Sequence, residues 1–113
     1  MLTYLAAPFS DPNPMVREGR YKLINRAAAY LISQGEHVLS PVSMFYPIDE
    51  ILSSDKLTSE FWTEYVLRFA ASCSKFTILT IPGWETSYGV SREREHFAAR
   101  GIDPVFLSVG NFT

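Results

Sequence analysis

The sequence predicts a single α/β domain with a parallel sheet of about four or five strands and helices on both faces, of the flavodoxin or Rossmann kind. Short apolar runs alternate with longer segments of helical spacing, in the order strand, helix, strand, loop, helix, strand, helix, strand. A length of 113 residues suits one domain, and 47% hydrophobic residues supply a core. No repeat, linker or low-complexity tract divides residues 1–113, so one domain is expected.

The first half opens with an apolar run, residues 2–7, which predicts a buried strand ended by Pro8. Helical spacing follows over residues 15–34, and a second short strand is expected over 36–40. Residues 41–57 are predicted to be irregular, with one or two helical turns over 48–52, because prolines interrupt them.

The second half begins with a helix predicted over residues 59–73, with Thr58 as its cap. Its apolar stripe is assigned to core packing and comprises Trp62, Val66, Phe69 and Cys73. A strand over 76–81, a helix over 89–100 and a last strand over 102–107 follow, and the tail after residue 108 is expected to be loose.

Parallel strands bring the following helix starts to one edge of the sheet, where open α/β sheets bind ligands. Residues 9–20, 41–57, 59–66 and 82–93 are therefore expected to converge on one rim. This rim is where the sequence predicts a site.

Glu93 is the candidate catalytic residue of this rim. It is expected in about the first turn of a helix, where backbone N–H groups and the helix dipole keep the pKa of a carboxylate low. An ionised, positioned carboxylate can act as a nucleophile. The alternative is an ordinary first-turn glutamate. Trp84 and Tyr88, two large aromatic residues in the preceding loop, favour a functional role.

Arg17 and Arg20 lie near the start of the first predicted helix, where arginine and free N–H groups can hold a phosphate. The alternative is solvation, or pairing with Glu18 and Asp11. Aromatic residues that could stack a nucleobase, or close a small core, are Phe9, Phe45, Tyr46, Trp62, Trp84 and Tyr88.

The composition argues against several other classes. A net charge of −2 offers no basic field for a nucleic acid polymer. One cysteine and two histidines argue against a disulfide and a metal site. Without a bilayer-length apolar run or a signal peptide, no membrane partner is expected, and the cytoplasm is the expected compartment. No dinucleotide or P-loop motif is present, so no cofactor is expected.

Two motifs resemble the nucleoside 2-deoxyribosyltransferase superfamily: residues 4–10, Tyr-Leu-Ala-Ala-Pro-Phe-Ser, and residues 89–93, Gly-Val-Ser-Arg-Glu. The chain is also similar, over nearly its full length, to a family of short bacterial and viral proteins of unassigned function. The shared segments are residues 4–8, 16–18, 40–41, 61–62 and 82–93.

The resemblance implies a nucleoside deoxyribosyltransferase-like fold and N-glycosidic chemistry on a nucleoside or its 5′-monophosphate, with Glu93 as the nucleophile that attacks C1′. It also implies a homo-oligomer, in a host cytoplasm if the protein is viral. The expected substrate-binding residues are Ala7, Pro8, Phe9, Ser10, Arg17, Arg20, Tyr46, Trp62, Trp84, Ser87 and Gly89.

The chain departs from the superfamily pattern at Val66 and Ser74, where aspartates are common. The aspartate at the first of these positions assists the leaving base in the superfamily. Glu64 could take the place of this aspartate only if the helix is rotated so that a different face from the predicted stripe points inward. The second hypothesis is therefore a catalytically degenerate nucleotide-binding protein.

Overall fold

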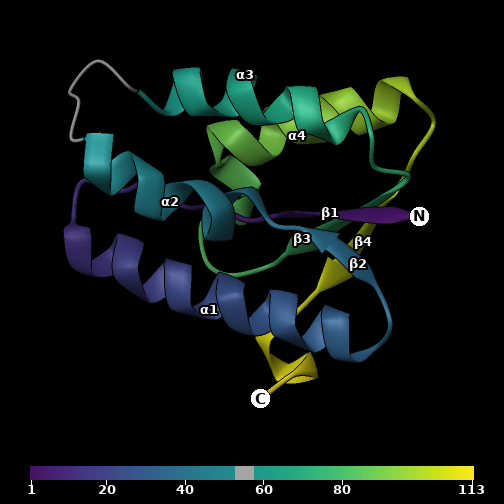
Figure 1. Cartoon of the computed structure of the whole chain (residues 1–113), viewed down its shortest axis with the longest axis horizontal. Helices are drawn as coiled ribbons and strands as arrows, with labels where there is room; N and C mark the ends of the chain where they lie inside the picture. The colour runs from purple at the N-terminus through teal and green to yellow at the C-terminus, as the bar shows by residue number, and fades with distance from the viewer. Residues whose placement is uncertain (53–57) are drawn as a thin grey trace.

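The computed structural model describes residues 1–52 and 58–113 and has the predicted α/β architecture (Figure 1). One parallel sheet has the strand order β2-β1-β3-β4. Its strands are β1 (Leu2–Ala6), β2 (His37–Leu39), β3 (Lys75–Leu79) and β4 (Pro104–Leu107). The helices are α1 (Pro14–Ser33), α2 (Pro41–Leu52), α3 (Ser59–Ala70) and α4 (Tyr88–Ala99), with two short 3-10 helices, η1 (Trp84–Thr86) and η2 (Val109–Asn111).

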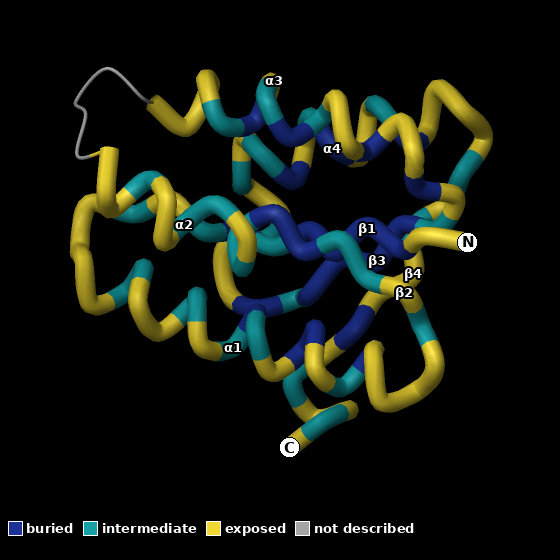
Figure 2. The backbone as a smooth tube through the Cα atoms, viewed as in Figure 1, coloured by how far each residue is buried: buried dark blue, intermediate teal, exposed yellow. Residues whose placement is uncertain are grey.

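Helices cover both faces of the sheet. The side chains of each strand alternate between the two faces, so both faces are apolar and each packs in its own core. Tyr4 and Ala6 of β1 pack in one core with α3 and α4. Leu5, between them, packs in a second core with α1. In Figure 1 the α3–α4 layer lies above the sheet and α1 lies below it, and Figure 2 shows the buried backbone concentrated between these layers.

The longest helix, α1, has 20 residues and the expected start. Pro14 occupies its first turn, and the side chain of Asn13 accepts a hydrogen bond from the backbone N–H of Met15. No helix in the described ranges is both long and apolar enough to cross a membrane.

The prediction of an irregular segment over 41–57 was wrong where the structure describes it, because residues 41–52 form α2. Pro47 lies inside this helix and removes one backbone donor. Packing offsets that loss, since Phe45 contacts the α3–α4 core and Val42 contacts the α1 core. Residues 53–57 of the predicted segment lie outside the described residues.

Two smaller expectations also differ from the structure. Helix α3 ends at Ala70, and its buried side chains are Thr63, Val66 and Ala70. Of the predicted stripe, Val66 and Cys73 are buried as expected, whereas Trp62 is half-buried and Phe69 is exposed. The tail after residue 108 is not loose: η2 forms there, and Phe112 packs on Tyr30 with ring centroids 6.0 Å apart.

Candidate functional site

A cavity of about 720 Å³ opens at the carboxyl ends of the central strands. The chain leaving β1 enters α1 on one face of the sheet, and the chain leaving β3 enters α4 on the other. Adjacent parallel strands whose connections diverge in this way leave a crevice between them. The predicted rim therefore coincides with the main cavity of the described residues.

The structure brings most of the expected site residues together. The cavity is lined by Glu93 and by the expected binding residues Ala7, Pro8, Phe9, Ser10, Arg17, Arg20, Tyr46, Trp62, Ser87 and Gly89. All three connections between the strands supply them: residues of the β1–α1 loop and α1, of α2 and α3, and of the loop before α4 and α4 itself.

Trp84 is not in the cavity wall. It begins η1, and its ring packs on Phe106 of β4 with centroids 5.4 Å apart. The guanidinium of Arg94 lies 5.6 Å from the same ring centroid. Trp84 therefore anchors the loop that carries Ser87 and Gly89 without facing the cavity.

Glu93 lies in the second turn of α4, not the first, because the helix begins at Tyr88. Its side chain is buried, and the hydroxyl of Tyr4 donates a hydrogen bond to its Oε2. Desolvation raises the pKa of Glu93 from 4.5 to about 8, although the Tyr4 bond acts to lower it. The expectation of a low pKa was wrong, since burial outweighs any influence of the helix start.

The other carboxylate oxygen of Glu93 lies towards Gly89. A Cβ at Gly89 would lie 4.0 Å from Glu93 Oε1 and 3.4 Å from Thr63 Oγ1. The absence of a side chain at Gly89 therefore keeps the approach to the carboxyl group open. Ser87, just before it, caps α4 by accepting a hydrogen bond from the backbone N–H of Val90.

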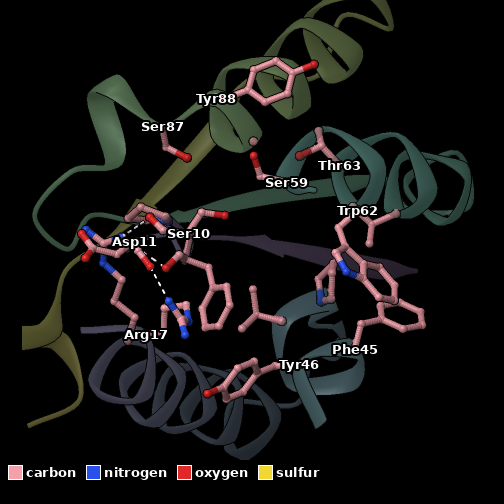
Figure 3. Close-up of a pocket in the computed structure, with 18 of the residues that line it drawn as sticks. Ser10, Asp11, Arg17, Phe45, Tyr46, Ser59, Trp62, Thr63, Ser87 and Tyr88 are labelled. Atoms are coloured by element: carbon pink, nitrogen blue, oxygen red, sulfur yellow. Dashed lines mark hydrogen bonds between the residues drawn. The ribbon is translucent and has the colours of Figure 1, made fainter. Parts of the chain in front are cut away.

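One end of the cavity is polar and contains the two expected arginines, of which Figure 3 labels Arg17. Arg17 Nη1 donates to the backbone oxygen of Asp11 at 2.5 Å. Arg20 donates to the backbone oxygens of Ser10 at 3.0 Å and of Phe9 and Pro82 at 3.3 Å each. Arg20 therefore joins the β1–α1 loop to the β3–α4 loop.

The opposite end is aromatic, as Figure 3 shows for Phe45 and Trp62. Their rings are stacked, with centroids 5.6 Å apart and planes at 29°. Along the side of the cavity, the ring of Tyr46 meets the ring of Phe9 edge-on at 4.8 Å. A hydrogen bond to Glu50 raises the pKa of Tyr46 to about 12.

The position at which the superfamily resemblance would imply an aspartate is apolar in the structure. Val66 is buried and lines the cavity. Glu64 does not line it, because its carboxylate pairs with Arg92 at 2.8 Å on the outer side of α3. Glu64 therefore supplies no carboxylate to the cavity.

Sequence reasoning missed two polar residues of the site. Tyr4 was assigned only to a buried strand, although a tyrosine hydroxyl in a core usually needs a hydrogen-bond partner. Asp49 lines the cavity and accepts a hydrogen bond from Trp62 Nε1 at 2.8 Å. It was hidden in the segment predicted to be irregular, where helical spacing from Phe45 could have placed it on the same face.

Residues 1–109 match the family model described as a domain of unknown function, DUF1937. The match includes every strand and every residue of the cavity wall. No curated protein matches the chain.

Proposed function

The chain belongs to the DUF1937 family, and we propose that it cleaves the N-glycosidic bond of a nucleoside or nucleoside 5′-monophosphate, or transfers its 2-deoxyribosyl group, with Glu93 as the nucleophile. The observation that carries the proposal is a buried Glu93 carboxyl group in a cavity with arginines at one end and stacked aromatic rings at the other. A phosphate and a base would take opposite ends of such a cavity.

The proposed reaction has two steps. A carboxylate oxygen of Glu93 bonds to C1′ of the sugar while the bond from C1′ to the base nitrogen breaks and the base leaves with that electron pair. Water, or the N–H nitrogen of a second base, then bonds to C1′ while the bond from C1′ to the Glu93 oxygen breaks and its electron pair returns to the carboxylate. The proton that this nucleophile loses balances the proton that the departed base takes up. Neither step requires a cofactor.

Burial of Glu93 bears directly on the first step. Its raised pKa means that the carboxyl group of the free site is mostly protonated at pH 7. The positive charge that develops on the sugar in the transition state favours the ionised form, because opposite charges attract strongly in a dry site. Cleavage should accordingly increase with pH up to about 8.

A second candidate function is binding without catalysis. Val66 favours it, since no acid stands at this cavity position to protonate the leaving base. Such a protein would hold a nucleotide with the same residues and leave it intact.

The test is base release from a panel of 2′-deoxynucleosides, ribonucleosides and their 5′-monophosphates, measured by liquid chromatography. Glu93→Gln keeps the shape of the side chain and removes the nucleophile, so base release should be lost. Glu95→Gln, the matched control, makes the same change at an exposed residue of α4 that pairs with Arg92. It should leave the rate unchanged.

A slow 2-fluoro sugar analogue should leave a covalent adduct on Glu93, visible in the intact mass. Base release by Glu93→Gln at the wild-type rate would refute the assigned nucleophile. Nucleotide binding by the wild type with neither base release nor adduct would favour the second function.

Self-association is also part of the proposal. Exposed apolar side chains gather on α2 and α3, and such surfaces commonly mark interfaces. They are Met44, Ile48, Ile51, Leu52, Phe61 and Phe69. Light scattering should detect an oligomer at micromolar concentration, and Ile51→Lys should weaken it; a monomeric wild type would exclude this interface.

A further inference from the structure

Asp49 is held at the aromatic end of the cavity by two elements. It lies on α2 one helical turn after Phe45, so both side chains share a face. Trp62 of α3 stacks on Phe45 and donates its indole N–H to Asp49 Oδ1 at 2.8 Å. The indole of Trp62 therefore has two roles. It stacks with Phe45, and it holds the carboxylate of Asp49 beside the stacked rings.

The chemistry of Asp49 is that of an acceptor. An ionised carboxylate has two oxygens and no donor, and the Trp62 bond uses only Oδ1. A ligand that meets the other oxygen must therefore bring an N–H or O–H group. A carbonyl oxygen in that place would be repelled by the carboxylate charge.

Nucleobases divide sharply by this criterion. Cytosine and adenine present an exocyclic amino donor, whereas uracil and hypoxanthine carry a carbonyl oxygen at the same place. We propose that Asp49 is a specificity-determining residue that selects ligands whose base carries an exocyclic amino group. This inference rests on the proposed function for the ligand class, and it adds which bases the site accepts.

The charges at the two ends of the cavity agree with this assignment. At the polar end the two arginines, Arg17 and Arg20, outnumber the carboxylate of Asp11. Asp49 lies at the aromatic end, on the second helix (Figure 3 shows Arg17 and Trp62 at these ends). A ligand with an anionic group at the polar end and N–H donors at the aromatic end is attracted electrostatically at both ends. In the reversed orientation, the interactions at both ends are less favourable. The cavity thus selects an orientation as well as a base.

The test uses matched ligands that differ only in the group facing Asp49. Calorimetry compares deoxycytidine with deoxyuridine and deoxyadenosine with deoxyinosine, each as nucleoside and as 5′-monophosphate. The wild type should bind the amino member of each pair at least about fivefold more tightly, the low end of discrimination by a good hydrogen-bond pair. Asp49→Asn, which still accepts the indole N–H but also presents a donor, should abolish or reverse both ratios.

Two further variants separate recognition from folding. Trp62→Phe keeps the stacked ring but releases Asp49, so the ratios should fall towards one while binding persists. Asp11→Asn removes the same charge at the polar end and should leave both ratios unchanged.

Equal affinities within both pairs, or unchanged ratios in Asp49→Asn, would overturn this inference without touching the role of Glu93. A clear amino preference without base release would uphold it and refute the proposed cleavage. Failure of every nucleoside and nucleotide to bind would overturn both.

Discussion

The hydroxyl of Tyr4 donates a hydrogen bond to Glu93 Oε2, joining β1 to α4 across 89 positions of the sequence. Two opposing effects meet at this bond. Burial raises the pKa of Glu93 and the bond lowers it, and burial prevails, so the pKa stands at about 8. Substitution of either residue should therefore change the protonation of the site.

Glu93→Gln should change how stability depends on pH. The pKa of Glu93 rises from 4.5 in the unfolded chain to about 8 in the fold, so the folded state binds more protons between these values. The contribution of the protonated group is fully present below pH 4.5 and is lost as pH rises through 8. The loss is on the order of a few kcal/mol. Urea unfolding of wild type at pH 5, 7 and 9 should show the decline in the free energy of unfolding, and Glu93→Gln should lack the part of the decline that Glu93 causes.

Glu95→Gln is the control and should behave as wild type. An identical decline in Glu93→Gln would contradict the raised pKa.

Tyr4→Phe should move the pKa of Glu93 further up. The variant keeps the ring, which packs on Phe76 and Phe97, but removes the hydrogen bond that favours the carboxylate. Carbon-13 NMR of the glutamate side chains, with Glu93→Gln to assign the signal, measures the midpoint directly. Base release, where detected, should shift to higher pH in parallel. A midpoint at or below that of wild type would show that the hydroxyl does not stabilise the carboxylate.

Arg17 and Arg20 should differ in their effect on ligand binding, although both were expected to hold a phosphate. Arg17→Ala should reduce the affinity for a nucleoside monophosphate relative to the nucleoside by about 1.5–3 kcal/mol. Arg20→Ala should weaken both ligands alike, because its guanidinium holds loop carbonyls. Calorimetry gives both affinities, with the exposed Arg26→Ala of the same helix as control. If instead Arg20→Ala lowers the affinity ratio and Arg17→Ala does not, the phosphate contact belongs to Arg20.

Gly83→Ala should destabilise the protein more than Gly35→Ala. Both glycines have positive φ, 96° and 90°, so alanine is strained by about 1–2 kcal/mol at either position. At Gly83 the added Cβ would also lie 3.0 Å from Arg20 Nη2, whereas nothing lies within 4 Å at Gly35. Displacing Arg20 from Pro82 should add about 0.5–1.5 kcal/mol, measured by urea unfolding. In an Arg20→Ala background this extra cost should disappear; its persistence would show another cause.

The fold was predictable because its signals are local. Each strand is a short apolar run between turn residues, and Asn13, Thr58 and Ser87 mark helix starts with the capping side chains seen in the structure. The start of α2 does carry such a signal, Ser40 followed by Pro41 at the first helical position, but the rest of the helix hides its period. Its apolar residues face two cores and Pro47 interrupts it, so the helical period is obscured.

The site was predictable as a place and less so in its electrostatics. Topology alone brings the three connections between the strands to one rim, which explains why the expected residues other than Trp84 line one cavity. The pKa of Glu93 depends on depth of burial and on a partner 89 positions away, neither of which sequence spacing records. The contact between Asp49 and Trp62 likewise depends on how α2 and α3 lie together.

The position of β1 inside the sheet has a consequence for biosynthesis. Leu2 pairs with His37, but Thr3 pairs with Lys75, so one neighbour of the first strand is translated only after α3. Until that segment leaves the ribosome, the nascent chain presents a row of unpaired backbone groups along β1, the kind of edge that promotes aggregation. The sheet can form around β1 only after β3 has been translated. This long-range pairing is slower than local helix formation. Chaperone capture is expected to be greatest for chains that end before Lys75.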